Sequence, residues 1–450
     1  MDNKKVVIVS GGTMERIDSH LALVAPAFGN IANQIKPIFE SVFEDKFDVV
    51  DVRTKIAGGK TTFYRPELHC VGETKSVEFK ELQHQEYPVI ATNDDLNSYV
   101  DSLIEDPTVK IVFFPVAVCD FKVDEIYNKD ETICPDKDIR LKSSEKYSFS
   151  IIPTNKIIKK IRQKRKDIFL VAFKQTSGKS PDEQYSEALK MCKSVSANLV
   201  LANDSVSKYN IIVTPEESRY PQPKGGTFNR EEALYELVEM SKLRSHLTFT
   251  RSTVITGESI PWDSEMVPES LRLVVDYCIE QKAYKPVSGV TAGHFAYKVN
   301  DTTFLTSIRK TDFNQLKTNG LVKIETDGPD TVLAYGARPS VGGQSQRIVF
   351  NDHPGLDCIV HFHSPLKENP RDDIPVKSQR EFSCGSHECG KNTSDGLKEF
   401  DNGIHCVYLE NHGPNIVFNQ KVNPSCIVDF IKSNFDIEHK TGGYVESLNE

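Results

Sequence analysis

The stretch "KKVVIVSGGT", residues 4–13, decides the fold class of the first half of the chain. It is an apolar run that ends in two glycines, and four more apolar runs follow it, separated by amphipathic stretches such as residues 32–43 and 93–106. Strands that are apolar on both faces and spaced by helices are typical of a parallel sheet covered on both sides. We therefore expect a doubly wound, Rossmann-like α/β domain over residues 1–246. The four later runs are "FDVVDVR" (47–53), "VKIVFFPVAV" (109–118), "DIFLVAF" (167–173) and "ANLVLAND" (197–204).

The second half has shorter apolar runs, broken by turns such as "NDTT" at 300–303 and "TDGPD" at 326–330. Short strands bounded by Asn, Asp and Gly predict an antiparallel or mixed sheet. The pattern loosens between the halves, so we expect a linker at 247–266. After it we expect an α/β/α domain with a largely antiparallel sheet over residues 267–450.

Composition narrows the function classes. The chain has 450 residues, with 64 acidic against 55 basic side chains, so we expect no nucleic-acid or membrane partner and favour small-molecule substrates. No apolar stretch approaches the roughly 20 residues of a membrane span, and the N-terminus shows no signal-peptide pattern. The ten cysteines form no CxxC pair, as expected of reduced thiols. These features predict a cytoplasmic protein.

The two glycines after the first strand suggest a phosphate site. Glycine lets backbone N–H groups approach phosphate closely, and neighbouring hydroxyls can donate as well. Polar residues follow other apolar runs too, at the carboxyl edge where open α/β sheets bind ligands. A plain tight turn is an equally common explanation of a Gly-Gly pair. The nucleotide-binding candidates from this pattern are Ser10, Gly11, Gly12, Thr13, Asp120 and Asn203.

Several motifs in the first half occur in a specific order: "VVIVSGGTMERID", "AVCDF", "LKSSEKYSFSIIPTNKII", "VAFKQTS" and "LVLANDS". In this order they resemble phosphopantothenoylcysteine synthetase, a ligase of coenzyme A biosynthesis. The resemblance implies joining of 4′-phosphopantothenate to cysteine through an acyl-nucleotide intermediate, with ATP or CTP and Mg²⁺. The "FKQTS" form is closer to the eukaryotic, ATP-associated type. By resemblance, Ala117 contacts the nucleotide, Phe173 packs near the base and Lys142 is the catalytic, charge-neutralising residue.

The chain departs from this family at one position. The family has an Asn in an "N-x-S-S-G" stretch that orients the acyl intermediate, and the corresponding segment here is "VAPAFG". Ala25 then stands at the Asn position and Phe28 at a Ser position. Because an alanine side chain donates no hydrogen bond, loss of this donor can cost on the order of 10²-fold in rate.

Two histidines in "DCIVHFHSPL", residues 357–366, suggest a metal site. His361 and His363 are separated by one residue, so an extended chain points both imidazoles to the same side. His412 follows another apolar strand in "VYLENHGPNIVF" and supplies a third ligand. Three histidines from two strand ends form a facial set that leaves metal positions open, and Zn²⁺ or a similar divalent ion is expected.

The second half resembles the class II aldolase and adducin family in "SGVTAGHFAYKVNDTTFLTS", "HPGLDCIVHFHSP" and "LENHGPNIVF". The resemblance implies a Zn²⁺-dependent site for a sugar-phosphate-like substrate and assembly as a homo-oligomer. The family's proton-transferring glutamate is replaced by Gly342, and its phosphate-binding "GN" by Gly293 and His294. An adducin-like module without aldol chemistry is the alternative for this half.

Three functions follow. The first is a ligase-like protein of coenzyme A biosynthesis fused to a metal-binding domain. The second is a zinc-dependent lyase or epimerase with a regulatory nucleotide-binding domain. The third, favoured by Ala25 and Gly342 together, is a non-catalytic scaffold of two degenerate enzyme folds.

Overall fold

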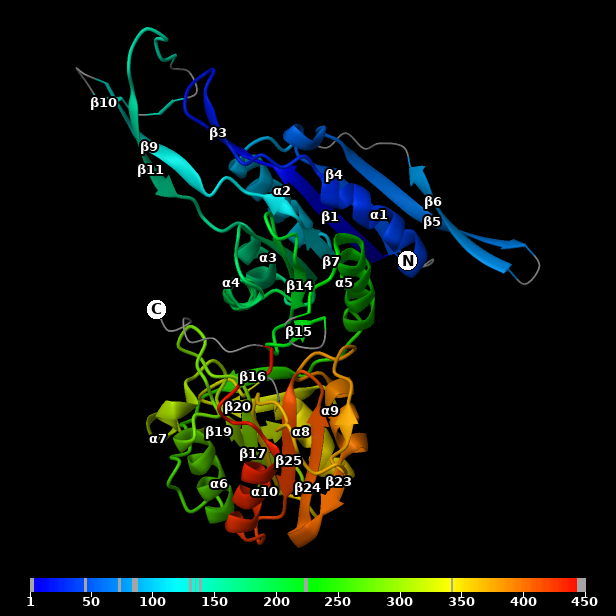
Figure 1. Ribbon diagram of the computed structural model, residues 1–450, viewed down its shortest axis with the longest axis vertical. Helices are drawn as coiled ribbons and strands as arrows, with labels where there is room; N and C mark the ends of the chain where they lie inside the picture. The colour runs from blue at the N-terminus through cyan, green and yellow to red at the C-terminus, as the bar shows by residue number, and fades with distance from the viewer. Residues whose placement is uncertain are drawn as a thin grey trace. The chain divides into compact units, whose positions relative to one another are not determined.

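The computed structural model separates into two compact units. Unit 1 consists of residues 1–178, 191–212 and 228–245, and unit 2 consists of residues 179–190, 213–227 and 246–450. Figure 1 shows the elements coloured along the chain. The structure describes residues 4–43, 47–71, 74–82, 88–128, 132–133, 135–136, 140–221, 226–340 and 343–442.

Unit 1 is built on a sheet whose strands run in the order β14-β13-β12-β7-β1-β4-β5-β6, with β8 paired to β1. Neighbours from β13 to β4 are parallel, whereas β4, β5 and β6 are antiparallel. The expected doubly wound parallel sheet is confirmed, with an antiparallel hairpin added at one edge. The strands are β1 Lys4–Gly12, β4 Phe47–Arg53, β5 Thr61–Val71, β6 Thr74–Leu82, β7 Val109–Phe114, β8 Val116–Ala117, β12 Phe169–Thr176, β13 Leu199–Asp204 and β14 Asn210–Val213.

The centre of this sheet is apolar on both faces. Consecutive side chains of β1, from Val6 to Val9, are at most 2% exposed, although they point alternately to opposite faces. Phe39 of helix α1 packs on Phe113 of β7 with ring centroids 5.1 Å apart. Burial on both faces requires helices on both sides of the sheet. The helices of unit 1 are α1 Asn30–Val42, α2 Asn93–Glu105, α3 Ile158–Lys164 and α5 Arg230–Arg244, whereas residues 181–190 of α4 Pro181–Val195 belong to unit 2.

Helix α2 illustrates how local sequence sets a boundary. Thr92 accepts a hydrogen bond from the backbone N–H of Asp95, and the Asp95 carboxylate accepts one from the N–H of Thr92, which is a capping box. Leu96, Val100 and Leu103 follow at helical spacing and are buried against the sheet.

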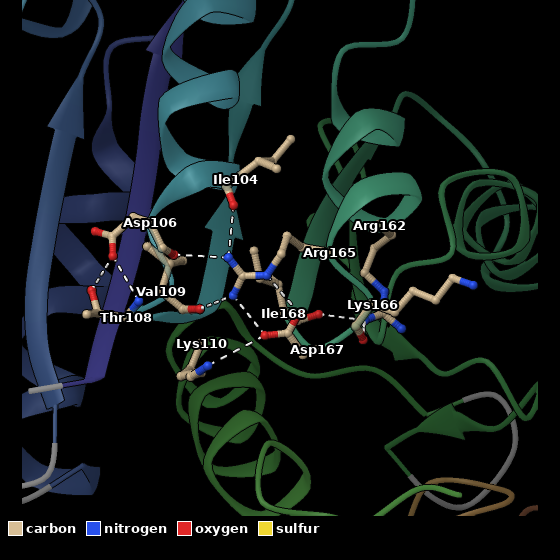
Figure 2. A network of polar contacts seen from close by, with 10 residues as sticks. All are labelled: Ile104, Asp106, Thr108, Val109, Lys110, Arg162, Arg165, Lys166, Asp167 and Ile168. Atoms are coloured by element: carbon tan, nitrogen blue, oxygen red, sulfur yellow. Dashed lines mark hydrogen bonds and ion pairs between the residues drawn. The ribbon is translucent and has the colours of Figure 1, made fainter. Parts of the chain in front are cut away.

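The other end of α2 is held by Arg165, at the end of a basic run (Figure 2). Its guanidinium donates hydrogen bonds to the carbonyls of Ile104, Asp106 and Val109 at 2.9, 3.0 and 3.3 Å, and to the carboxylate of Asp167. A cation at the C-terminus of a helix satisfies carbonyls that have no partner within the helix. This arginine therefore has a structural role.

Two smaller β-structures and an extended hairpin complete unit 1. Only residues 61–64 of β5 pair with β4, and the rest of the β5–β6 hairpin extends past it (Figure 1). A separate antiparallel sheet has the order β10-β9-β11, and β2 pairs with β3. These strands are β2 Met14–Arg16, β3 Ala22–Val24, β9 Phe121–Tyr127, β10 Thr132–Ile133 and β11 Ser148–Pro153, and a 3₁₀ turn covers Lys55–Ala57.

Unit 2 is built on a second sheet with the order β16-β20-β19-β18-β17-β21-β25-β24-β22, and β23 pairs with β24. All described neighbours are antiparallel except β16 with β20 and β22 with β24, so the expected largely antiparallel sheet is confirmed. The strands are β16 Arg251–Ile255, β17 His294–Lys298, β18 Thr303–Ser307, β19 Leu321–Thr326, β20 Thr331–Tyr335, β21 Cys358–His361, β22 Val376–Lys377, β23 Lys398–Phe400, β24 Ile404–Leu409 and β25 Gly413–Phe418.

Two buried clusters give the sheet of unit 2 its core. One contains Trp262, Phe295 and Phe362, and the other contains Phe304 stacked on Phe350 with ring centroids 5.9 Å apart. The helices are α6 Glu269–Glu280, α7 Leu316–Asn319, α8 Gly343–Asp352, α9 His387–Gly396 and α10 Pro424–Asn434, with 3₁₀ turns at Phe313–Gln315 and Asp401–Gly403. Within the described parts of both units, every helix is too short or too polar to cross a membrane.

The boundary between the units differs from the expected one in two respects. Strand β16 lies inside the range 247–266, for which a linker was expected; it is an edge strand of mixed polarity, mostly exposed, and pairs with β20. Residues 179–190 and 213–227 belong to unit 2 although they precede residue 246. Strand β15, Arg219–Tyr220, lies in the second of these segments. Packing of distant segments is not encoded in local hydrophobic periodicity.

Candidate functional site

The glycine loop at the end of β1 is shaped by close packing of the chain. Gly11 has a φ of +106°, and a Cβ there would lie 2.1 Å from Oγ1 of Thr54. A Cβ on Gly12 would lie 1.7 Å from the carbonyl oxygen of Ala25. Both glycines are therefore required by the fold itself, whether or not a phosphate binds.

Two hydroxyl groups beside this loop point to a ligand more directly. Ser10 and Thr54 are 1% and 0% exposed, and neither side-chain oxygen has a hydrogen-bond partner among the described residues. A Cβ on Gly29, which precedes α1, would lie 3.4 Å from the Ser10 hydroxyl, and the first turn of α1 has no side-chain cap. Buried hydroxyls and uncapped helix N–H groups all offer protons to an anion. The glycine loop therefore brings two unpartnered hydroxyl donors close to the uncapped start of α1.

Thr13 differs from these two residues because its hydroxyl is occupied. It donates to Oδ1 of Asn93 at 2.6 Å and accepts from the backbone N–H of Cys119 at 2.9 Å. The backbone N–H of Thr13 donates to the carbonyl of Ala117 at 3.0 Å, so these two predicted nucleotide contacts lie side by side. In this arrangement Thr13 ties the loop to the neighbouring strand ends.

The remaining predicted residues of the first site lie at strand ends or in turns. Phe173 and Asn203 are half-buried on the adjacent strands β12 and β13. Asp120 forms an ion pair with Lys156 at 2.6 Å, and both side chains are exposed. Lys142, the predicted catalytic residue, has an exposed side chain that pairs with Glu145 at 3.0 Å.

Ala25, which by the family resemblance stands at the position of an Asn, lies against the glycine loop. Its backbone N–H donates to the carbonyl of Thr13 at 3.0 Å, and its carbonyl packs on Gly12. The position is half-buried and offers only a methyl group. The backbone of this part of the site is in place, but the side-chain donor is missing.

The three predicted metal ligands of unit 2 come together. His361 ends β21, His363 follows it, and His412 immediately precedes β25, which pairs with β21. The rings are at most 4% exposed, and one ligand atom from each lies within 4.8 Å of the others. Gly413 has a φ of +122°, and a Cβ there would lie 2.2 Å from the carbonyl of Phe362. Glycine at this turn lets the two strand ends approach.

The spacing of two of the donor atoms fits a tetrahedral metal ion. Nδ1 of His361 lies 2.7 Å from the carbonyl oxygen of Pro414, and because a carbonyl can only accept, Nδ1 carries the proton and Nε2 carries the lone pair. That Nε2 lies 3.3 Å from Nε2 of His412. Two nitrogens bound tetrahedrally to Zn²⁺ at roughly 2.0–2.1 Å would be separated by about 3.3 Å.

Burial keeps His361 and the neighbouring His294 in the neutral form. Desolvation, followed by the neighbouring rings of His412 and His294, holds the pKa of His361 well below its ordinary value. Burial lowers the pKa of His294 to about 3, with a smaller contribution from His363. These imidazoles are therefore neutral at physiological pH, and a neutral imidazole can bind a divalent ion.

His294 adds a fourth ring to this region. It pairs with His361 in the β17–β21 ladder, the ring centroids are 4.8 Å apart, and its Nδ1 lies 2.6 Å from Nε2 of Gln346. The amide nitrogen of Gln346 can only donate, so Nδ1 of His294 is the acceptor. Gly342, the position of the family's missing glutamate, lies outside the described residues.

A carboxylate that sequence reasoning missed lies beside the histidines. Glu217, in the segment 213–227 of unit 2, is 1% exposed in its side chain, and its Oε2 lies 3.2 Å from Nδ1 of His363. Lys440, 5% exposed, forms an ion pair with the same oxygen. The stretch "TPEES" carries no local signal for this contact, because it resembles any polar turn.

Comparison with known proteins finds a different similarity for each part of the chain. The family described as Class II Aldolase and Adducin N-terminal domain matches residues 273–367, which include His361 and His363. The Coenzyme A biosynthesis bifunctional protein CoaBC of Thermococcus kodakarensis is 27% identical over 174 residues. That match covers 34% of this chain and 41% of the relative, so the chain spans less than half of the relative's length.

Two solved structures give further points of comparison. The DNA/pantothenate metabolism flavoprotein from Streptococcus pneumoniae is 18% identical with a TM-score of 0.39, covering 52% of this chain and 96% of that chain. An L-fuculose 1-phosphate aldolase is 18% identical with a TM-score of 0.28, covering 38% of this chain and 82% of that one. The two resemblances expected from the motifs are confirmed by the sequence matches: residues 273–367 match the class II aldolase and adducin family, and the N-terminal part of the chain is similar to the coenzyme A biosynthesis protein CoaBC.

Proposed function

We propose that this chain is a ligase-like protein of coenzyme A biosynthesis whose second unit is a divalent-metal-binding, aldolase-like domain. The observation that carries the first part is the pair of buried hydroxyls of Ser10 and Thr54 beside the start of α1. Neither has a hydrogen-bond partner among the described residues. Leaving such groups without a hydrogen bond costs about 1–3 kcal/mol each. A nucleotide phosphate would satisfy both.

In the proposed reaction, the carboxylate of a phosphopantothenate-like substrate attacks the α-phosphorus of a nucleoside triphosphate, and pyrophosphate leaves. The amine of cysteine then attacks the acyl carbon, and the nucleoside monophosphate leaves. Mg²⁺ supplies charge neutralisation at the phosphates. Gly11, Gly12 and Ser10 would hold the phosphates, Phe173 would pack near the base, and Asn203 would contact the nucleotide. Whether ATP or CTP is used is part of the test below.

Ala25 limits the expected rate. The backbone carbonyl of Ala25 lies against Gly12, and by the family resemblance its methyl group stands where the family has an amide that orients the acyl intermediate. We therefore expect a turnover on the order of 10²-fold below that of a site with the amide.

The proposal is tested by measuring pyrophosphate release from ATP and from CTP with 4′-phosphopantothenate, before and after cysteine is added. Release with one nucleotide, followed by product formation with cysteine, supports the ligase. Nucleotide binding without release with either nucleotide would favour the scaffold. Absence of nucleotide binding would refute the function of the first unit.

For the second unit, the three-histidine cluster supports binding of Zn²⁺ or a similar ion. His361, His363 and His412 would hold the ion, which supplies Lewis-acid polarisation of a substrate carbonyl. This geometry also favours a second candidate, a zinc-dependent lyase or epimerase acting on a sugar-phosphate-like substrate, with the first unit as regulator. Aldol cleavage of a phosphorylated sugar by the purified protein would support that candidate. A cytoplasmic homo-oligomer is the form in which we propose either function operates.

A further inference from the structure

The segment 213–221 contributes Glu217 to the histidine cluster. It is assigned to the same compact unit as the histidines, although 146 residues separate Glu217 from His363. Such a buried carboxylate is unusual, because burial of an unpaired charge is costly. Pairing with His363 and Lys440 accounts for its presence.

The segment is held in place on both sides of Glu217. The Tyr185 hydroxyl donates to the backbone carbonyl of Glu217 at 2.7 Å. Ser218 donates its hydroxyl to the carbonyl of Asn411 at 2.8 Å, and the Asn411 side chain donates to the carbonyl of Arg219 at 2.7 Å. Asn411 immediately precedes His412, so the segment is connected to two of the three metal ligands.

The hydrogen bond to Glu217 selects one tautomer of His363. The Lys440 ammonium can only donate, so Oε2 of Glu217 acts as an acceptor in that pair. Nδ1 of His363, 3.2 Å from the same oxygen, therefore carries the ring proton. The lone pair of neutral His363 is then on Nε2. His361 is held in the same tautomer by the carbonyl of Pro414.

We infer that Glu217 is a positioning residue for the proposed metal site, supplied from a segment outside residues 273–367, which match the aldolase family. It orients the His363 ring, keeps the lone pair on Nε2, and places negative charge one ring away from the ion. This inference rests on the proposed metal binding of the second unit. Histidine ligands commonly donate their other N–H to a carboxylate, and loss of such a partner typically costs 10–100-fold in metal affinity.

Lys440 separates this role from a merely structural ion pair. If Glu217 serves only to pair with Lys440, removal of either partner should have the same effect on Zn²⁺ affinity. If Glu217 orients His363, replacing Lys440 leaves the hydrogen bond to His363 in place. It also removes a positive charge from the neighbourhood of the ion, so Zn²⁺ binding is retained or strengthened.

The test uses the full-length chain and measures the Zn²⁺ dissociation constant by competition with a chromogenic chelator. Glu217→Gln preserves size and removes the charge, and it should weaken Zn²⁺ binding about 10-fold, within the range for such partners. Lys440→Met should bind Zn²⁺ at least as tightly as the wild type. Asp182→Asn is the matched control, because it alters the 2.8 Å ion pair with Arg219 in the same segment without touching Glu217 or His363. It should keep the wild-type affinity.

A second readout reports the tautomer. The Nδ1–H proton resonance of His363, assigned by its loss in His363→Ala, should be present in the wild type and in Lys440→Met, and should shift in Glu217→Gln. If Glu217→Gln fails to fold, Glu217→Asp is the alternative. It keeps the charge but shortens the side chain, so the carboxylate no longer reaches Nδ1 of His363, and Zn²⁺ binding should again weaken.

The outcomes that would overturn the inference are distinct from failure of the proposed function. Equal Zn²⁺ affinities for the wild type and Glu217→Gln would show that Glu217 does not position the ligand. Equal losses in Glu217→Gln and Lys440→Met would assign it to a structural ion pair instead. A wild-type protein that binds no Zn²⁺ would refute the metal site itself, and the inference with it.

Discussion

The glycine loop of unit 1 and the histidine cluster of unit 2 differ in what surrounds their backbone. In the loop, the backbone is tightly packed and two hydroxyls lack partners, but the side chain at Ala25 cannot donate. In the cluster, all three ligands are present, and a carboxylate from a distant segment lies against one of them. A site can therefore keep its backbone and lack a side-chain donor, or keep its side chains and gain a supporting residue from a distant segment.

The largest effect is expected from removing one histidine of the cluster. His363→Ala removes one of three ligands, so the purified protein should fall from about one Zn²⁺ per chain to nearly none after metal-replete expression. Metal analysis by mass spectrometry measures this. His405→Ala is the control, because His405 is a half-buried histidine of β24 outside the cluster, and it should retain the metal. A metal-free wild type, or an unchanged metal content in His363→Ala, would contradict the site.

The next effect concerns the missing donor of the glycine loop. Ala25→Asn places an amide at a half-buried position and leaves the backbone contacts with Thr13 and Gly12 in place. We expect ligase turnover to rise by up to about 10²-fold. The rate of pyrophosphate release checks this. Ala25→Leu adds bulk without a hydrogen-bond donor, and its turnover should not rise. Unchanged turnover in Ala25→Asn, with nucleotide still bound, would favour the scaffold.

A smaller effect tests the unpaired hydroxyls. Thr54→Val keeps the shape of the side chain and removes a hydroxyl that has no partner, so the ligand-free protein should be as stable as the wild type or slightly more so. Nucleotide affinity should fall about 10-fold, corresponding to roughly 1–1.5 kcal/mol for one hydrogen bond. Calorimetry with ATP and CTP measures the affinity.

Thr13→Val is the matched comparison for Thr54→Val. The Thr13 hydroxyl has partners on both sides, so its removal should destabilise the ligand-free protein by about 1–3 kcal/mol. Thermal unfolding distinguishes the two variants. If Thr54→Val leaves nucleotide affinity unchanged, the hydroxyl at that position does not contact the ligand.

The smallest effect lies outside both sites, in the Arg165 network of Figure 2. The hydrogen bond from Arg165 lowers the pKa of Asp167 to about 2. Because the folded-state pKa is lowered, the stabilisation is fully present above the unfolded value of about 3.9 and is lost as the pH falls toward 2. The pair is partly exposed, so Asp167→Asn should cost less than about 1 kcal/mol at pH 7. Urea unfolding should show this difference shrinking below pH 4.

Sequence patterns predicted the strands and site residues that are recognisable from their neighbours along the chain. The strand β1 is recognisable because four consecutive buried residues are apolar. The histidines are recognisable because they lie at strand ends: His361 and His363 at the end of β21, and His412 just before β25, which pairs with β21. Strand β16 was missed because "RSTVI" is short, mixed in polarity and lies at a sheet edge. Glu217 could not be found because its burial depends on His363 and Lys440, which are distant in the sequence. Contacts of that kind are set by tertiary packing.

The assignment of residues 213–227 to unit 2 has a consequence for the order of synthesis. At roughly 5–20 residues per second, Glu217 leaves the ribosome about 7 to 30 seconds before His363, which lies 146 residues later. The carboxylate must remain hydrated during that time, while the strands of unit 1 that precede it can already pair. A gene fragment that encodes only residues 267–450 would produce the three histidines without Glu217. The complete ligand environment therefore exists only in a chain translated through both units.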